Sequence, residues 1–214
     1  MAPDGSPVDL YRRLPERTEE AALLHRLIPA EGAVLDLGCG TGRMAEPLAR
    51  WGHPVTGVDN EPAMLATLRD ATGICADIAT VDLGVRFSAV LLMSHLVNSS
   101  DQGFVDSIFA TAREHVDESG FIVVERYPPG WVTTCRDVDQ QDDGVRYVLR
   151  VVDRTGDVLT AVIRYEFDGL VAEQRFSARD LDDDRLTTLA ARVGLRPTSR
   201  LDAVGGLAVL AIAE

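Results

Sequence analysis

Short apolar runs recur along the first part of this chain, separated by stretches with helical spacing. Runs at 33–37, 54–59, 73–77, 87–93 and 121–125 are predicted strands, and those at 33–37, 87–93 and 121–125 are rich in Val, Ile and Leu. The run at 87–93 is apolar without alternation, which is typical of a central parallel strand covered on both faces. Strands that alternate with helices predict a parallel, doubly wound sheet.

Helices are predicted between these strands. Residues 1–30 form an N-terminal helical region, and 43–50 and 103–116 are further helices with apolar residues at helical spacing. Asn60 is predicted to cap another helix, because Pro62 then falls in the first turn, where its missing N–H costs nothing.

The pattern changes in the second half of the chain. Apolar and polar residues alternate across roughly 145–176, with glycine-containing turns, which predicts an antiparallel insert of two or three strands. An amphipathic helix ends at Gly194, and strands around 196–202 and 207–213 follow. We expect an α/β, Rossmann-like doubly wound sheet of mostly parallel strands, with a reversed C-terminal strand pair and an antiparallel β insert.

Length and composition favour one domain over 1–214. We expect a helical cap at 1–30, a ligand-binding core at 31–126 and an insert at 145–176 that serves as a lid or a dimer contact. The net charge of −13 disfavours nucleic acid as a partner. All 21 basic residues are arginine, and the lack of lysine excludes a Walker A loop, a Schiff-base lysine and a pyridoxal-phosphate site.

Cysteine usage and hydropathy suggest a cytoplasmic protein. Cys39, Cys75 and Cys135 are odd in number and have no CxxC spacing, which argues against disulfides and against a zinc or other metal site. No apolar run approaches the length of a membrane span, and the N-terminus lacks the layout of a signal peptide, so no membrane partner is expected.

A glycine-dense turn directly behind the first strand is the main functional signal. The segment reads Asp36-Leu37-Gly38-Cys39-Gly40-Thr41-Gly42. Glycines let the backbone take positive φ and let a ligand approach the main chain, and the following helix offers free N–H groups. A dinucleotide site needs G-x-G-x-x-G, but here the third glycine comes one position early and Arg43 stands where that pattern needs a small residue. An acid near the turn also disfavours pyrophosphate.

The arrangement Asp-x-Gly-x-Gly-x-Gly resembles motif I of the class I S-adenosylmethionine-dependent methyltransferases, and the resemblance covers about residues 30–125 well and 177–214 loosely. It implies S-adenosyl-L-methionine as cofactor, with Asp59 on the ribose hydroxyls. Asp77 and Ile78 fall where the family contacts adenine. The implied cofactor-binding residues are Tyr11, Arg17, Asp36, Gly38, Cys39, Gly40, Gly42, Asp59, Asn60, Met64, Asp77, Ile78, Met93 and Ser94.

Several of these residues have a structural interpretation as well. A strand-end Asp is often only a helix cap, although Asp59 and Asp77 together with the glycine turn favour a ligand site. Cys39 is interpreted as a small filler of the turn, with nothing nearby to lower its pKa. The resemblance implies that Arg17 pairs with the cofactor carboxylate and that Tyr11 hydrogen-bonds there; an exposed helix position is the alternative for Arg17.

The acceptor side rests on fewer residues. His95 lies at the carboxyl end of a central strand, where α/β sheets bind ligands, and is either a base that takes a proton from the acceptor or a structural polar residue. Asn98 shares its loop. Tyr127 and Trp131 follow the fifth strand and either wall an acceptor pocket or plug the core beneath the insert.

The resemblance implies O- or N-methylation of a small-molecule acceptor, a metabolite or natural product. Ser94-His95-Leu96-Val97 replaces the Asn/Asp-Pro-Pro-Tyr/Phe tetrad of amino-methyltransferases that act on nucleobases. The alternative is an inactive S-adenosylmethionine-binding protein that acts as a sensor or partner subunit. A nicotinamide-dependent oxidoreductase is a further alternative, which Arg43 disfavours. A homodimer through the insert is also considered.

Overall fold

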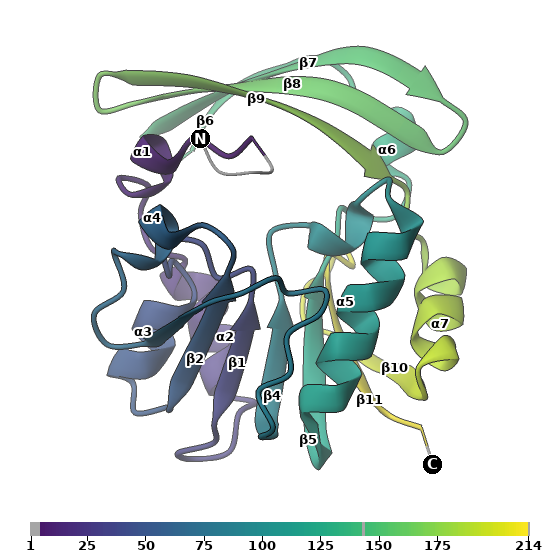
Figure 1. Ribbon diagram of the computed structural model, residues 1–214. Coiled ribbons are helices and arrows are strands. Elements are labelled where there is room, and N and C mark those ends of the chain that lie inside the picture. The colour runs from purple at the N-terminus through teal and green to yellow at the C-terminus, as the bar shows by residue number, and fades with distance from the viewer. Residues whose placement is uncertain (1–4, 143, 214) are drawn as a thin grey trace.

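The computed structural model describes residues 5–142 and 144–213. These residues form a seven-stranded, mostly parallel sheet with helices on both faces and a separate four-stranded antiparallel sheet, drawn at the top of Figure 1. We call the four-stranded sheet the lid and the rest of the described chain the core. The predicted Rossmann-like α/β class with an antiparallel insert is confirmed.

The core sheet has the strand order β10-β11-β5-β4-β1-β2-β3. Its central pairs are parallel, whereas β11 pairs antiparallel with both β5 and β10, which confirms the predicted reversal at the C-terminal strand pair. The strands are β1 (Val34–Leu37), β2 (Val55–Asp59), β3 (Thr72–Cys75), β4 (Phe87–Leu92), β5 (Val116–Glu125), β10 (Leu195–Arg200) and β11 (Leu207–Ile212).

Helices bury both faces of the core sheet. Val90 and Leu92 of β4 pack with α5 and α7 on one face, whereas Ala89 and Leu91 pack with α2 and α3 on the other. Because both faces are covered, β4 needs no polar alternation. The helices are α1 (Val8–Tyr11), α2 (Thr18–His25), α3 (Ala45–Arg50), α4 (Pro62–Leu65), α5 (Gln102–His115), α6 (Trp131–Thr134), α7 (Asp183–Arg192) and the 3₁₀ helix η1 (Leu96–Asn98).

The lid is larger than the predicted insert. Its antiparallel strands are β6 (Val138–Asp142), β7 (Val145–Thr155), β8 (Val158–Phe167) and β9 (Leu170–Arg179). The predicted antiparallel insert over 145–176 is confirmed by β7, β8 and β9, but β6, which precedes it, was missed. That strand reads VDQQD and its residues are largely exposed at the sheet edge, so it carries no hydrophobic alternation.

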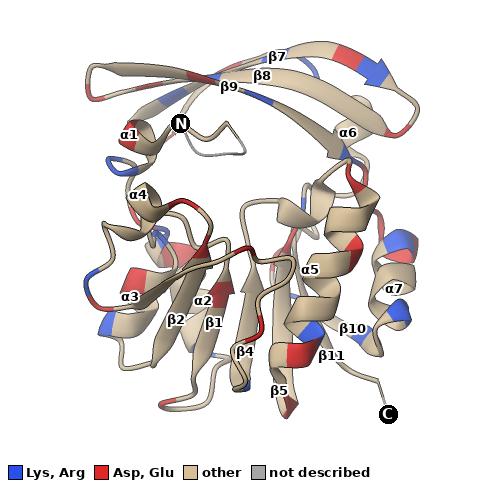
Figure 2. Cartoon of the chain, viewed as in Figure 1, with Lys and Arg blue, Asp and Glu red and all other residues tan. Residues whose placement is uncertain are grey.

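Two hydrophobic clusters hold the lid over the carboxyl ends of the core strands (Figure 1). At one end Leu10 and Leu14 of the N-terminal segment pack against Val145 and Tyr165 of the lid. At the other end α6 and the segment before it pack against the lid residues Leu149, Leu159, Ala161 and Ala178. Figure 2 shows charges of both signs spread over the lid, where Arg146 pairs with Asp139 and Glu166.

Some predicted boundaries and caps differ from the structure; β5, for example, begins at Val116, not at residue 121. Of the helical region expected at 1–30, the described part contains only α1 and α2, and residues 1–4 lie outside the described residues. Asn60 does not cap α4. The cap is Glu61, whose Oε1 accepts the Ala63 N–H at 3.0 Å, since Asp59 takes the Glu61 N–H and keeps the chain extended one residue further. β3 ends two residues before Asp77.

Within the described ranges, no helix has the length and apolar character needed to cross a membrane.

Candidate functional site

The glycine turn joins β1 to α3 and leaves an open approach to the main chain. The N–H groups of Gly38 and Cys39 both donate to the Val58 carbonyl, at 2.8 and 3.1 Å. Gly38 has φ +78° and a Cβ there would lie 2.8 Å from Leu96. Gly40 has φ +54°, and a Cβ there would meet nothing within 4 Å. The turn is therefore closed by packing at Gly38 and open at Gly40.

Asp36 lies beneath this turn at the end of β1. It is 1% exposed, and its Oδ1 is buried without a hydrogen-bond partner among the described residues. Burial raises the pKa of Asp36 to about 7, and the charges of Asp59 and Glu125 act in the same direction against the opposing charge of Arg17. A buried acceptor without a partner is costly, which indicates that a ligand supplies the missing donor.

Asp59, at the end of β2, folds back onto the turn. Its Oδ2 accepts the Gly40 N–H and its Oδ1 accepts the Glu61 N–H, both at 2.9 Å. These two bonds fix the carboxylate beside the Gly40 main chain, and a ribose contact for Asp59 stays a prediction. We call residues 36–42 together with Asp59 the glycine corner.

The structure brings some of the other implied cofactor residues to this corner. Ile78 is buried, with Cδ1 3.6 Å from the Cβ position of Gly38, whereas Asp77 is exposed and its Oδ1 accepts the Ala79 N–H. Met64 is buried against Tyr11, while Asn60 is exposed. An adenine contact for Asp77 stays a prediction.

Two residues of the turn serve its packing. Cys39 is buried, and its Sγ lies 2.6 Å from the Cβ position of Gly57, so a glycine in β2 makes room for the thiol. Burial raises the pKa of Cys39, in keeping with its interpretation as a small filler of the turn. At Gly42, where φ is +83°, Leu68 fills the space of a side chain.

Arg17 faces the glycine corner from the N-terminal segment. Its Nη1 and Nη2 donate to both carboxylate oxygens of Glu125, at 2.6 and 2.8 Å, and its Nε and Nη2 donate to Glu20. The Arg17 side chain is 16% exposed and thus largely covered, not on an exposed helix face, and it is already paired with carboxylates. The same segment is tied to the turn, because the Arg17 N–H donates to the Arg43 carbonyl and Arg43 Nε donates to the Pro15 carbonyl.

Glu125 is the functional residue that sequence reasoning missed. It ends β5 as Asp59 ends β2, so the acid at a strand end was an available signal. Its Oε2 also accepts the Ser94 N–H at 2.7 Å. Burial by itself raises the pKa of Glu125, but the Arg17 hydrogen bonds, the His95 and Arg17 charges and the Ser94 N–H outweigh it, so that the pKa lies below its usual value.

The turn after β4 carries His95 next to Glu125. Ser94 and His95 both have positive φ, 56° and 62°. His95 Nδ1 lies 3.6 Å from Glu125 Oε1. Burial lowers the pKa of His95 and the Arg17 charge lowers it further, while Glu125 opposes both. The lowered pKa favours the neutral ring, the form that can accept a proton.

An aromatic group extends from His95 toward the lid. The His95 and Tyr127 rings meet edge to face, with 4.0 Å between their centroids. Tyr127 stacks on Trp131 at a centroid distance of 4.0 Å, and the Phe176 ring of β9 lies 6.4 Å from Tyr127 between centroids. We call these four residues the aromatic group. Tyr127 and Trp131 also pack in the cluster that anchors the lid, so both interpretations of Trp131 fit this position.

Asn98 joins the lid to the core. Its Nδ2 donates to the Arg179 carbonyl at the end of β9, and its Oδ1 accepts the Tyr127 N–H, both at 2.9 Å. The residue is 2% exposed. Both ends of its amide are thus engaged by the main chain, which gives Asn98 a structural role, and a substrate contact stays a prediction.

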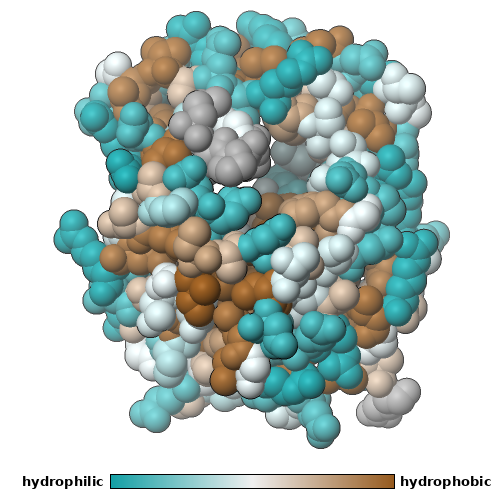
Figure 3. All heavy atoms as spheres, viewed as in Figure 1, coloured by the Kyte–Doolittle hydropathy of each residue, from teal (hydrophilic) through white to brown (hydrophobic). Residues whose placement is uncertain are grey.

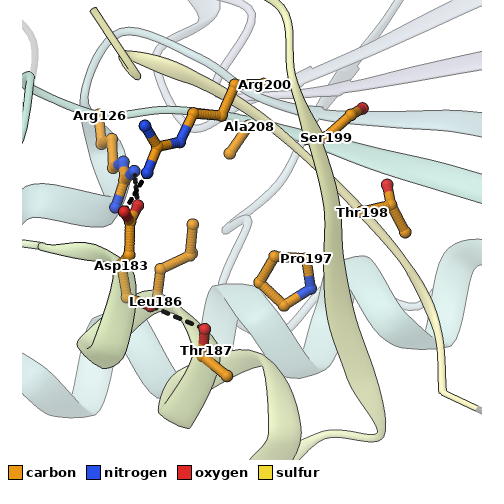
Figure 4. A pocket seen from close by; sticks show the side chains of 9 residues that line it. All are labelled: Arg126, Asp183, Leu186, Thr187, Pro197, Thr198, Ser199, Arg200 and Ala208. Carbon is orange, nitrogen blue, oxygen red and sulfur yellow. Dashed lines mark hydrogen bonds and ion pairs between the residues drawn. The ribbon is translucent and has the colours of Figure 1, made fainter.

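The space between lid and core is visible as a hollow in the molecular surface in Figure 3. A separate cavity of about 220 Å³ lies on the far side of β5, between α7 and β10 (Figure 4). There Arg126, whose side chain is fully buried, and Arg200 converge on Asp183. Since neighbouring strand residues point to opposite faces, Glu125 serves the site while Arg126 fastens α7 to the sheet.

Comparison with known proteins agrees with this geometry. Residues 34–120 match the family model described as methyltransferase domain. A dTDP-3-amino-3,4,6-trideoxy-alpha-D-glucopyranose N,N-dimethyltransferase of Streptomyces venezuelae is 30% identical over 190 residues, which cover 81% of this chain and 76% of that protein. A ubiquinone biosynthesis O-methyltransferase of Azorhizobium caulinodans is 30% identical over 138 residues, which cover 60% of this chain and 52% of that protein.

Similarity in structure extends over nearly the whole chain. The CcbJ methyltransferase from Streptomyces caelestis has a TM-score of 0.77 and 22% identity, with 99% of this chain and 98% of that chain covered, which shows a shared fold. In sequence, however, the chain spans only about half the length of the first curated relatives that it matches, 53% and 52%.

Proposed function

Because this chain belongs to the class I S-adenosylmethionine-dependent methyltransferases, we propose that it transfers a methyl group from S-adenosylmethionine to a small-molecule acceptor. The observation that carries the proposal is the buried Oδ1 of Asp36, which has no partner among the described residues and lies under the open glycine corner. The ammonium group of this cofactor is a donor of the kind that Asp36 lacks.

The residues present fit the cofactor. When bound, S-adenosylmethionine supplies a methyl group on a positively charged sulfur. Asp59 accepts hydrogen bonds from the ribose hydroxyls, Asp36 faces the ammonium group, and Arg17 faces the carboxylate. The other proposed binding residues are Tyr11, Gly38, Cys39, Gly40, Gly42, Asn60, Met64, Asp77, Ile78, Met93 and Ser94.

We propose that the acceptor binds beside the aromatic group, within reach of His95. His95, whose lowered pKa favours the neutral ring, accepts the acceptor's proton at Nε2, and the adjacent Glu125 stabilises the imidazolium that forms. Asp36, Asp59 and Glu125 make the site acidic, and aromatic faces attract cations, so the site favours an amine over a hydroxyl. The amino-sugar N-methyltransferase relative supports nitrogen, and the O-methyltransferase relative keeps oxygen as the second candidate.

The proposal has three further parts, which concern the partner and location of the protein, its oligomeric state and the acceptor space. The net charge of −13 supports a small molecule, not nucleic acid, as partner and is consistent with a cytoplasmic protein that has no membrane partner. The outer face of the lid exposes Val152 and Val171, which supports a homodimer through the lid. Trp131, Tyr127 and Asn98 are proposed to shape the acceptor space.

The first test is calorimetry with S-adenosylhomocysteine and with NADH on the full chain. We expect binding of the former and none of the latter; a preference for NADH overturns the proposal. A matched pair of variants localises the site: Gly40→Ala and Gly156→Ala both place a methyl group at positive φ with nothing within 4 Å. Each loses about 1 kcal/mol of stability. Only Gly40→Ala blocks ligand approach, and we expect its affinity to fall about tenfold or more.

The second test is a screen of amine and hydroxyl acceptors with methyl-labelled cofactor. Label transfer to amines supports nitrogen as the acceptor atom, and transfer to hydroxyls alone supports oxygen. Binding of S-adenosylhomocysteine without turnover of any acceptor supports the alternative, an inactive sensor or partner subunit.

A further inference from the structure

The turn that presents His95 is strained. Ser94 and His95 occupy the left-handed region at φ 56° and 62°, and the Leu96 N–H reaches the Met93 carbonyl only at 3.4 Å. Positive φ at both central residues is the pattern of a type I′ turn, which normally uses Asn and Gly. Such strain persists only where surrounding contacts impose it. Something other than the turn's own sequence must therefore hold it.

Glu125 supplies that contact. Its Oε2 accepts the Ser94 N–H at 2.7 Å, inside the strained turn, while its Oε1 lies 3.6 Å from His95 Nδ1. Both oxygens are in turn fixed by the two guanidinium nitrogens of Arg17. The carboxylate is buried and joins three segments that are far apart in the sequence: the N-terminal segment, the turn after β4 and the end of β5.

We infer that Glu125 is a positioning residue for methyl transfer, which holds the Ser94–His95 turn in its strained conformation and directs Nδ1 of His95 toward itself, so that Nε2 is presented to the acceptor. The inference rests on the proposed function and deepens it. The proton lost by the acceptor nitrogen or oxygen is taken up at Nε2. The positive charge that forms on the ring is then balanced by the Glu125 carboxylate, and the proton later leaves to solvent.

Several charged and titratable groups face this pair. Arg17 comes from the N-terminal segment, where it also contacts Glu20; Asp36 comes from the end of β1, and Tyr127 from the segment after β5. Of these, Arg17 opposes a charge on His95. Replacing Glu125 by Gln removes the carboxylate beside the ring that favours its protonated form, and leaves Glu20 as the remaining carboxylate partner of Arg17. The midpoint of His95 titration must then move to lower pH.

The test is a proton–carbon NMR titration of the histidine rings in the full chain, without cofactor or acceptor, with the His95 signal assigned from a His95→Gln variant. We expect Glu125→Gln to lower the midpoint of the His95 titration by about 0.5 to 1 pH unit. Glu46→Gln is the matched control, because Glu46 is also a buried glutamate that accepts main-chain N–H groups, from Arg69, Asp70 and Ala71. The control is expected to leave the His95 midpoint unchanged.

A second variant separates positioning from mere stability. Glycine tolerates positive φ, so Ser94→Gly added to Glu125→Gln is expected to restore thermal stability but not the His95 midpoint. Glu125→Asp keeps the charge and is expected to fold and to shift the midpoint less than Glu125→Gln. With an acceptor identified, Glu125→Gln is expected to lower kcat about tenfold, with acceptor KM little changed and the rise of activity displaced to lower pH.

An unchanged His95 midpoint in Glu125→Gln, or equal shifts in Glu125→Gln and Glu46→Gln, overturns the inference. The titration needs neither cofactor nor acceptor, so its outcome is independent of the proposed function. Failure of wild-type protein to bind S-adenosylhomocysteine would remove the proposed function while leaving the His95 result intact.

Discussion

The glycine corner and the aromatic group face the same space but are built in different ways. In the corner, Asp59 reaches the Gly40 N–H across a separation of 19 residues, and both belong to one β–loop–α–β unit. The aromatic group depends on long-range contacts. Tyr127, for example, is held through its N–H by Asn98, whose amide also donates to the Arg179 carbonyl, 81 residues away from Asn98. The corner is fixed by main-chain hydrogen bonds and charge, whereas the aromatic group is fixed by packing under a lid.

This difference suggests a division of labour. Main-chain geometry that is set locally suits a ligand of constant shape, such as a cofactor. Side chains brought in by a separate sheet can vary without disturbing the core, which suits an acceptor. The comparison therefore predicts that changes in the corner alter cofactor affinity and that changes in the aromatic group alter acceptor use.

The largest effect is expected from Asp59→Ala. It removes a carboxylate that accepts two main-chain N–H groups and, in the proposal, the ribose hydroxyls. Because hydrogen bonds to a charged group contribute about 1.5–3 kcal/mol each, we expect S-adenosylhomocysteine to bind about 100-fold more weakly by calorimetry. Asp82→Ala is the control, since Asp82 accepts the Gly84 N–H in a similar turn. Equal affinities of the two variants would contradict the role of Asp59.

An intermediate effect is expected from Trp131→Ala in the aromatic group. Loss of the ring stacked on Tyr127 at 4.0 Å is expected to raise acceptor KM up to about tenfold, because such ring pairs contribute about 0.5–1.5 kcal/mol. Cofactor affinity stays constant. Trp51→Ala, which removes a tryptophan 38% exposed beside His25, changes neither quantity. A matching fall in cofactor affinity in Trp131→Ala would break the division between the two regions.

The smallest effect is expected in the pH dependence of cofactor affinity, which we attribute to Asp36 in the glycine corner. The pKa of Asp36 is about 7, and the ionised form favours a ligand ammonium, so affinity should rise about two- to fivefold from pH 6 to pH 8. Asp36→Asn is expected to abolish this rise in calorimetry, whereas Trp131→Ala keeps it. An unaltered pH dependence in Asp36→Asn would exclude Asp36 as its source.

The free energy of unfolding of Asp36→Asn provides a second measurement of the Asp36 pKa. The pKa of Asp36 in the folded protein lies above its ordinary value of 3.8, so the folded state binds more protons than the unfolded state between about pH 4 and 7. The contribution of Asp36 to the free energy of unfolding is therefore fully present below about pH 4 and is lost as the pH rises through 7. Chemical denaturation of Asp36→Asn should show a smaller loss over that range than wild type.

Much of the core was predictable from its own sequence. The apolar run of β4 and the glycine turn after β1 each specify local structure, and parallel strands then bring their carboxyl ends to one edge. Asp36 and Asp59 met there as expected. Arg43, which first argued against a dinucleotide, holds the N-terminal segment through the Pro15 carbonyl.

The prediction was poorer where contacts are long-range or polar. β6 lacks hydrophobic alternation because it lies at an exposed edge, so the lid was drawn too small. Glu125 was not selected because its importance arises from Arg17 and Ser94, which are distant in the chain. Asn98 was seen as a loop residue near the acceptor, and the structure shows its amide between lid and core.

The sequence by itself determined the Rossmann-like order of strands and the glycine corner, because hydrophobic periodicity and glycine at positive φ act over a few residues. Only the tertiary structure decided that Arg17 is paired with Glu125, that the Ser94–His95 turn is strained, and that four strands cover the site. Those features depend on which distant side chains share a low-dielectric space, and no local pattern encodes that proximity.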